Sequence, residues 1–434
     1  MSLTLRKTSR VLTPWSAQAN RNVPTIVRGE RSYLYDENGK RYVDFSAGLV
    51  AVNLGHAHPK LVAAIAEQAA AVCYVAPSLG NDKRERLADA IVELAPWSEG
   101  GRVFFTAGGG EANEDAVKIA RTLTNRHKIL TAYRSFHGSA PGAGTLTGEN
   151  RRWPNEPGIP GVARFFAPFP YRSPFHTRDA AEETQRAIAH LEDVILYEGR
   201  ERIAAILIEP IVGSNGVVLY SEGYLRELRK VCDRYGILLI FDEVMTGFGR
   251  TGKPFASQTF DVTPDMFTFA KGVTSAYVPL GGVAVRESLA SYFDETPLPC
   301  GHTFSGHPLA MAAGVATLEA YEDVFPRVPG VEKSLRDSLL QLQQRHPSIG
   351  EVRGTGAFFA LELVKDRQTR EPLVEWQGKQ TLNAFVADLL SRGVYVYARF
   401  NTIIIAPPLV IEPAEIAEAV AGFDAALGSL EQSL

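Results

Sequence analysis

An aspartate and a lysine each follow a short apolar run, and they are the most informative side chains of this sequence. The run at residues 237–241 is followed by Asp242, and the run at 266–270 is followed by Lys271. Apolar runs of this length are typical of buried β-strands. Because open α/β sheets place ligands at the carboxyl ends of their strands, we expect both charges to lie at one site.

The two charges together suit one kind of chemistry. A desolvated lysine holds its proton weakly, so Lys271 is expected to act as a neutral nucleophile that forms an imine with an aldehyde. A carboxylate attracts a protonated ring nitrogen about 4 Å away by roughly 4 kcal/mol at a dielectric constant of about 20. The pair therefore predicts pyridoxal phosphate as cofactor. Taken singly, Asp242 could instead cap a helix or pair with an arginine, and Lys271 could extend into solvent.

A glycine turn offers a place for a phosphate. Residues 104–113 read as the end of a strand, a turn containing Gly109 and Gly110, and the start of a helix. Backbone N–H groups in such a turn can bind an anion, and the helix N-terminus adds about half a positive charge. A plain strand-to-helix connection is the simpler explanation. The turn lacks the G-x-G-x-x-G spacing of dinucleotide sites, which weighs against a more distant alternative, a nicotinamide-dependent oxidoreductase.

Further candidates follow other predicted strands. Phe136 and His137 come after the run at 128–132, where an aromatic ring could stack on a planar cofactor or simply fill the core. Glu209 ends the run at 203–208 and could bind ring substituents or cap a loop. Thr303 lies in a glycine-containing loop and is a candidate phosphate contact.

No metal site is predicted. His56 and His58 are close in sequence, but no acidic or thiol partner has the spacing of metal ligands. The three cysteines are odd in number and widely spaced, so they support neither a disulfide framework nor a zinc site.

From about residue 101, short β-branched and aromatic runs alternate with helical stretches. The predicted strands are 102–105, 128–132, 203–208, 237–241, 266–270 and 282–285, and the predicted helices are 111–122, 177–191 and 222–235. This alternation predicts an α/β fold with a mostly parallel sheet covered by helices on both faces. Residues 139–175 have no strong period, and we interpret them as a long surface excursion, either an active-site wall or a subunit contact.

The length of 434 residues exceeds what one hydrophobic core usually supports, so we expect two domains. The predicted large, cofactor-binding domain spans residues 60–310. Residues 1–59 and 311–434 are expected to form a smaller α+β domain, with a hairpin at 26–45 and a terminal helix at 412–427.

Composition is that of an ordinary soluble globular protein, with 45% hydrophobic and 22% charged residues. The net charge is −4 with both signs mixed, so no basic stripe indicates nucleic acid as a partner. No apolar run is long enough to span a membrane, and the first seven residues lack the apolar segment of a secretory signal. A cytoplasmic location is therefore expected.

In order along the chain, these features resemble the class III aminotransferases, pyridoxal-phosphate enzymes of fold type I. The most specific segment is Asp242-Glu-Val-Met-Thr-Gly-Phe-Gly-Arg-Thr-Gly252, followed at the expected distance by Phe269-Ala-Lys271-Gly. The resemblance extends from Tyr42-Val-Asp-Phe-Ser to Ala406-Pro-Pro-Leu, which is nearly the whole chain. It implies a large domain built on a mostly parallel sheet of the seven-stranded type, with a smaller α+β domain from both termini.

The resemblance also implies roles for single residues. The family lysine matching Lys271 bears the cofactor, and the aspartate matching Asp242 binds the ring nitrogen. The residues matching Val244 and Phe136 pack on the two ring faces. The residue matching Thr303 reaches the phosphate of the neighbouring subunit, which implies a homodimer with shared active sites.

The sequence departs from the family pattern near the substrate. Gly110 stands where a Ser or Thr usually supplies a hydroxyl to the phosphate. Val50 stands where many amine:pyruvate members have tryptophan, which implies a wider substrate pocket. Arg399 lies two positions after the usual place of a carboxylate-binding arginine, so it is a candidate for that role or a surface arginine on a strand. Met245, where 4-aminobutyrate and ornithine enzymes typically have Gln, resembles the ω-amino acid or amine:pyruvate branch.

The resemblance implies a transaminase that moves an amino group from an ω-amino acid or primary amine, of the β-alanine, taurine or 4-aminobutyrate type, to pyruvate or another 2-oxo acid. A pyridoxal-phosphate-dependent phospho-lyase or epimerase on the same fold is the main alternative. A binding protein without catalysis is the least favoured, because it would keep a desolvated acid and lysine without chemistry.

Overall fold

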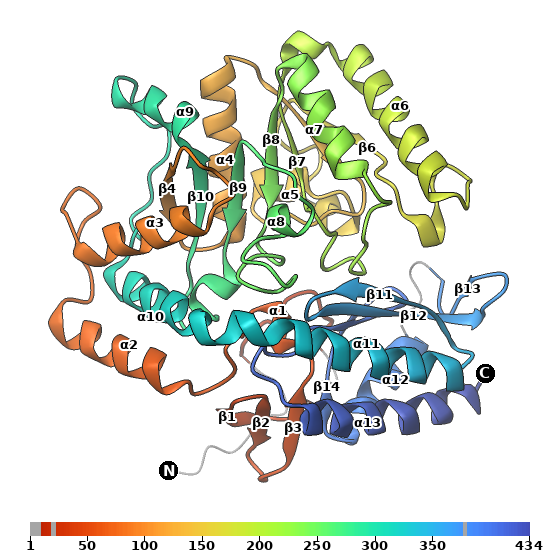
Figure 1. Cartoon of the computed structure of the whole chain (residues 1–434). Coiled ribbons are helices and arrows are strands. Elements are labelled where there is room, and N and C mark those ends of the chain that lie inside the picture. Colours follow the sequence, from red (N-terminus) through yellow and green to blue (C-terminus); the bar gives the residue numbers. More distant parts are fainter. Residues whose placement is uncertain (1–9, 19–22, 376–379) are drawn as a thin grey trace.

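The computed structural model describes residues 10–18, 23–375 and 380–434, which form three sheets and the helices around them (Figure 1). The first seven residues, which we interpreted as lacking the apolar segment of a secretory signal, lie outside these ranges. Among the described residues, no helix combines the length and the apolar character that crossing a membrane requires.

The central sheet has seven strands in the order β4-β10-β9-β8-β7-β5-β6. Its strands are β4 (Gly101–Thr106), β5 (Lys128–Ala132), β6 (Val162–Phe165), β7 (Ile203–Ile208), β8 (Leu238–Asp242), β9 (Met266–Phe269) and β10 (Gly281–Arg286). Strand β10 is antiparallel to both of its neighbours, and the remaining pairs are parallel. The mostly parallel seven-stranded sheet is confirmed.

Helices cover both faces of this sheet, because its central strands are apolar on both sides. All six residues of β7 are buried. Ile206 and Ile208 belong to the core that includes residues of α6 and α7, whereas Ala205 and Leu207 belong to a second core with α4. These helices are α4 (Gly109–Thr124), α6 (Ala180–Glu198) and α7 (Tyr224–Tyr235).

The interpretation of residues 139–175 as a surface excursion is wrong. The segment contains α5 (Pro141–Leu146), the 3-10 helices η1 (Asn150–Asn155) and η2 (Pro170–Arg172), and β6, which extends the sheet by pairing with β5. Ala143, Thr147 and Glu149 are buried. Strand β6 has only four residues, Val-Ala-Arg-Phe, which is too short and too polar to show a period.

Two smaller sheets lie beneath the central sheet in Figure 1. One contains β1 (Ile26–Glu30), β2 (Tyr33–Asp36), β3 (Arg41–Asp44) and β14 (Val394–Tyr395). The other contains β11 (Ile349–Thr355), β12 (Phe358–Asp366), β13 (Glu371–Pro372), β15 (Tyr397–Arg399) and β16 (Thr402–Ile405). Because β14 pairs parallel to β3, the two ends of the chain share a sheet, which confirms the smaller α+β unit drawn from both termini. The boundaries at residues 60 and 310 stay a prediction.

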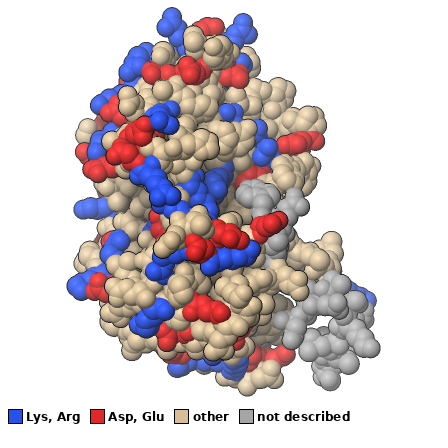
Figure 2. All heavy atoms as spheres, turned by 90° about the vertical axis from the view of Figure 1, so that its right-hand side faces the viewer, with Lys and Arg blue, Asp and Glu red and all other residues tan. Residues whose placement is uncertain are grey.

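The other helices connect and cover these sheets. The longer ones are α2 (Pro59–Ala71), α3 (Asp82–Leu94), α10 (Pro308–Val324), α11 (Val328–Arg345), α12 (Gln380–Ser391) and α13 (Pro413–Glu431). The short ones are α1 (Ala47–Val50), α8 (Ala256–Thr259), α9 (Glu287–Ala290), η3 (Arg200–Arg202), η4 (Lys271–Thr274), η5 (Ser291–Asp294) and η6 (Phe325–Arg327). On the face seen in Figure 2, basic and acidic side chains are interspersed, with one group of basic side chains near the middle.

Candidate active site

A cavity of about 350 Å³ opens at the carboxyl ends of the central strands. Asp242 is the last residue of β8, and Lys271 lies two residues beyond the end of β9. Both residues line this cavity. The structure therefore brings the predicted acid and lysine to one site, whose size is in the usual range for small-molecule pockets.

The Asp242 carboxylate is held by buried donors. It is 4% exposed, and its Oδ2 atom lies 2.7 Å from Nδ1 of His137. The Asn113 side-chain amide donates to the same oxygen at 2.8 Å, and the Val244 amide donates to Oδ1 at 3.1 Å. An ionised carboxylate only accepts, so Nδ1 of His137 carries a proton. These bonds hold the carboxylate in place and leave part of Oδ1 for a further donor in the cavity.

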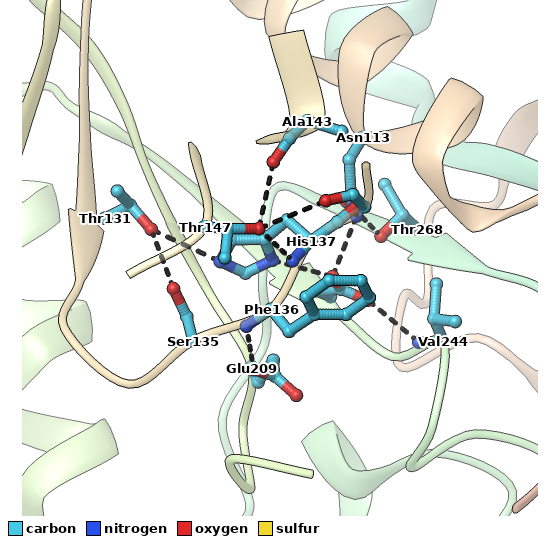
Figure 3. Close-up of polar contacts among 12 residues, drawn as sticks. Asn113, Thr131, Ser135, Phe136, His137, Ala143, Thr147, Glu209, Val244 and Thr268 are labelled. Atoms are coloured by element: carbon cyan, nitrogen blue, oxygen red, sulfur yellow. Dashed lines mark hydrogen bonds and ion pairs between the residues drawn. The ribbon is translucent and has the colours of Figure 1, made fainter. Parts of the chain in front are cut away.

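Asn113 is a site residue to which the sequence analysis assigned no role. Its amide group donates to the His137 carbonyl as well as to Asp242, and its Oδ1 atom accepts from the Thr268 hydroxyl at 2.8 Å. Figure 3 shows Asn113, His137 and Thr268 converging from α4, the loop after β5, and β9. The sequence offered one signal, an asparagine at the start of a predicted helix just after the glycine turn. In the structure this residue is 1% exposed and lies on the inner face of α4.

Lys271 lines the cavity without a polar partner for its amine in the described part of the chain. Within residues 10–18, 23–375 and 380–434, its amine makes no hydrogen bond or ion pair. Burial lowers the pKa of Lys271, while the charges of Asp242 and Glu209 oppose this shift. Its backbone has a left-handed φ of 49°, which is uncommon for a residue with a side chain.

Glu209 lies at the same edge of the sheet, and each of its carboxylate oxygens accepts from one backbone amide. Its Oε1 atom accepts from the Phe136 amide at 2.9 Å, as Figure 3 shows, and its Oε2 atom accepts from the Gly213 amide at 2.8 Å. Burial is the main cause that raises the pKa of Glu209 to about 7. The carboxylate thus ties the Phe136 loop to the segment after β7.

The glycine turn forms the wall of the cavity at the start of α4. Gly108, Gly109 and Gly110 line it, and Gly109 packs so closely on Val244 that an added Cβ would lie 2.8 Å from a valine methyl. The Gly109 and Gly110 amides make no hydrogen bond to the described chain, as expected for the first turn of a helix. They are available to an anion.

The Phe136 ring lies between the cavity and an arginine. Phe136 and Val244 both line the cavity, whereas the Arg151 guanidinium covers a face of the Phe136 ring at 3.7 Å from its centroid. Arg151 is buried and bound to Glu149, and its Nη2 donates to Ser214 at 2.8 Å. A cation held in this way fixes the plane of the ring.

Three predicted residues lie outside the lining of the cavity. The Val50 side chain is buried in an apolar cluster with Ile211 and Phe358, and Ala51 lines the cavity beside it. Arg399 is ion-paired with Glu149 and donates from Nε to Asn215 at 3.0 Å.

Thr303 is exposed on a loop of the surface, where its carbonyl accepts from the Tyr74 hydroxyl at 3.0 Å. The roles of Val50, Arg399 and Thr303 stay predictions.

These residues fit pyridoxal phosphate. The cavity offers a carboxylate for a pyridinium N–H, free amides at a helix N-terminus for a phosphate, apolar and aromatic walls for a flat ring, and an unpaired lysine for an aldehyde. The described residues contain no cluster of His, Cys, Asp or Glu that could hold a metal ion.

Comparisons with known proteins agree with this site. The sequence profile of the family Aminotransferase class-III matches residues 16–427, so the chain belongs to that family. The chain is also 34% identical over 429 residues to the taurine–pyruvate aminotransferase of Bilophila wadsworthia, covering 94% of this chain and 92% of the relative.

Solved structures give the same result. A taurine:2-oxoglutarate aminotransferase from Bifidobacterium kashiwanohense, solved with PLP and glutamate, is 42% identical with a TM-score of 0.94, covering 98% of this chain and 96% of that one. An (S)-enantioselective omega-transaminase from Thermomicrobium roseum is 36% identical with a TM-score of 0.91 and 96% coverage of both chains. The protein is therefore an aminotransferase of fold type I that uses pyridoxal phosphate, and the nicotinamide alternative is set aside.

Proposed function

We propose that this aminotransferase takes the amino group from an ω-amino acid or primary amine, of the β-alanine, taurine or 4-aminobutyrate type, and transfers it to pyruvate or another 2-oxo acid. The convergence of Lys271 and Asp242 on one cavity carries the proposal for the reaction. The proposal for the substrates is supported by relatives whose names specify taurine with pyruvate or with 2-oxoglutarate.

Each wall of the cavity would hold one part of the cofactor. Asp242 would bind the ring nitrogen, and its contacts to His137 and Asn113 support that role by fixing the orientation of the carboxylate. Phe136 and Val244 would bracket the ring. The amides of Gly109 and Gly110 would bind the phosphate without the hydroxyl that Gly110 lacks.

Pyridoxal phosphate, when bound, supplies an aldehyde that reacts with amines and a protonated ring that stabilises negative charge on the neighbouring substrate carbon. The Asp242 carboxylate would keep that ring protonated. The Lys271 amine, whose pKa burial lowers, would accept a proton from the substrate carbon and donate it to the adjoining carbon of the bound cofactor. Glu209 would hold the Phe136 loop in position through the Phe136 amide.

The substrate end of the site would contain Val50 and Arg399. Arg399 and Arg151 share the single carboxylate of Glu149, so this corner carries one excess positive charge. A carboxylate or sulfonate on the substrate would compensate it. This charge favours an amine donor with an anionic tail over a neutral amine.

We further propose a homodimer with shared active sites, in the cytoplasm, with domain boundaries at residues 60 and 310. Large apolar side chains support the dimer because they are exposed around the Thr303 loop. Phe304 is 60% and Leu79 is 61% exposed, and the Tyr74 ring lies 6.3 Å from that of Phe304. Such a patch is typical of protein interfaces, and it would bring Thr303 to the phosphate of the partner subunit.

A panel of amines offered with pyruvate or 2-oxoglutarate tests the proposal. We expect alanine or glutamate to form together with the carbonyl product, and taurine and β-alanine to react faster than a neutral amine of the same length. Release of ammonia or phosphate without a new amino acid would instead indicate the phospho-lyase alternative, and inversion of a chiral amine without transfer would indicate the epimerase.

A further inference from the structure

A second cavity, of about 360 Å³, lies in the segment between α5 and β6. It shares no lining residue with the first cavity. Its lining residues include Thr145, Arg152, Asn155, Glu156, Ile159 and Arg164. None of these residues has a part in the transamination site described above.

The charge in this second cavity is unbalanced. Arg152 and Arg164 both line it, and Glu156 is the one carboxylate among its lining residues. The Arg152 Nε atom lies 3.1 Å from a Glu156 oxygen. Burial lowers the pKa of Arg164, and the nearby positive charge of Arg152 lowers it further. Two guanidinium groups thus lie partly shielded from water, and the single carboxylate of the lining is paired with Arg152.

Both arginines keep donors that the described protein leaves unused. Arg164 donates from Nε and Nη2 to the carbonyls of Thr147 and Thr145, which hold its position without neutralising its charge. The Arg152 Nε atom is buried and, despite its closeness to Glu156, forms no hydrogen bond in the part of the chain that is described. The ion pair with Glu156 is therefore poorly aligned for a hydrogen bond, which leaves this donor for a better-placed acceptor.

Asn155 adds a third group with spare donors. Its side-chain amide forms no hydrogen bond within the described ranges, although it is packed so closely on Gly144 that a Cβ there would lie 2.4 Å from Nδ2. Gly144 belongs to α5, which therefore fixes where the Asn155 amide lies. The cavity thus contains two guanidinium groups and one amide in positions set by packing.

Planar donors of this kind bind carboxylate, sulfonate and phosphate oxygens. Ile159, Val162 and Pro157 add apolar surface to the same cavity. We infer that this second cavity is a binding site for a small organic oxyanion, distinct from the transamination site, with Arg152 and Arg164 binding the charged group and the apolar wall packing on a short carbon chain.

Helix α5 separates the two sites. Thr145 on the side of the second cavity donates to the Pro141 carbonyl, and Ala143 on the other side packs against Gly138, which lines the first cavity. Figure 3 shows Ala143 and Thr147 beside His137. A ligand in the second cavity therefore lies behind the wall that carries the His137 loop.

Calorimetric titration of the holoenzyme with succinate, and separately with inorganic phosphate, tests the inference. We expect saturable binding that weakens about 10- to 100-fold in Arg152→Gln and in Arg164→Gln, because each loses a charged hydrogen-bond donor. Arg226→Gln, on the exposed face of α7, is the matched control and should bind like the wild type. Tighter binding of succinate identifies a carboxylate ligand, and tighter binding of phosphate identifies a phosphoryl ligand.

Two further variants keep the test decisive. Asn155→Asp adds a negative charge where the side chain has no protein partner, so it should fold and should also weaken binding. Arg399→Gln alters the proposed substrate end of the transamination site and no residue of the second cavity, so it shows which of the two sites binds the probe. The inference is wrong if Arg399→Gln abolishes binding while Arg152→Gln and Asn155→Asp leave it unchanged, or if neither probe binds at millimolar concentration.

Discussion

The two cavities have nearly the same volume, about 350 and 360 Å³, but they are built in different ways. The first lies where parallel strands end, and its charged groups, Asp242, Glu209 and Lys271, come from three neighbouring strand ends. The second is built from a loop segment and contains mainly basic groups. Acids and a lysine on a rigid sheet suit chemistry on a bound cofactor, whereas arginines on a loop suit the binding of an anion.

The largest expected effect comes from Lys271→Ala. Without the amine that accepts and returns the proton, kcat should fall by about 10⁴-fold. The binding of succinate in the second cavity should not change, because no contact joins Lys271 to it. Steady-state rates and calorimetry on the same preparation measure both. Loss of both properties would mean that the two cavities are not independent.

Asp242→Asn keeps the shape of the side chain and removes its charge. The attraction of about 4 kcal/mol between a carboxylate and a ring cation corresponds to a decrease in kcat of about 10³-fold. The visible absorption spectrum of the bound cofactor should shift as well, because the ring nitrogen loses its counter-charge. Asp233→Asn, at an exposed ion pair of α7, is the control. Activity within tenfold of the wild type would contradict the role of Asp242.

Glu209→Gln tests the pH dependence of stability. The pKa of Glu209 is raised to about 7 from an ordinary 4.5, so the folded state binds this proton more tightly than the unfolded state. Its contribution to stability is fully present below about pH 4.5 and is lost as the pH rises through about 7. Relative to Glu209→Gln, the wild type should therefore lose up to about 3 kcal/mol of unfolding free energy between pH 4.5 and 7.5. Denaturant titrations at several pH values measure this, and a difference that is independent of pH would contradict it.

The smallest expected effect concerns the wall between the cavities. The Thr147 hydroxyl accepts from the His137 amide at 3.1 Å and donates to the Ala143 carbonyl at 3.1 Å. Thr147→Val keeps the volume and leaves that amide unpaired, which should destabilise the fold by about 1–3 kcal/mol. Thr122→Val, at a half-buried helical position with one local bond, should cost less. Equal melting temperatures for the two variants would show that the wall does not depend on Thr147.

Much of the first cavity could be predicted from the sequence because a buried strand is visible as a continuous run of apolar residues. The apolar run before Asp242 indicates both the strand and its end, and the strands on either side are equally regular. The family match then confirmed the cofactor and the reaction class. Helix α3 was not predicted, although Asn81 caps it and Leu87 and Ile91 form its buried face.

The remaining site contacts could not be predicted, because they join residues that only the sheet brings together. Asn113 and Thr268 are 155 positions apart, and Arg399 and Glu149 are 250 apart. No spacing in the sequence connects such pairs. The second cavity was missed for a related reason, since the 3-10 helix, the short β6 and the loops around it have no period that would indicate buried structure.

The pairing of β14 with β3 has a consequence for synthesis on the ribosome. The first three strands of that sheet leave the ribosome early, but their fourth partner is encoded some 350 positions later. Until then the edge of β3 lacks its partner strand β14, and an unpaired strand edge promotes aggregation. The enzyme therefore depends on the synthesis of residues 394–395 before the sheet begun by β1 to β3 can close, so chains truncated before β14 should aggregate even when the catalytic sheet is whole.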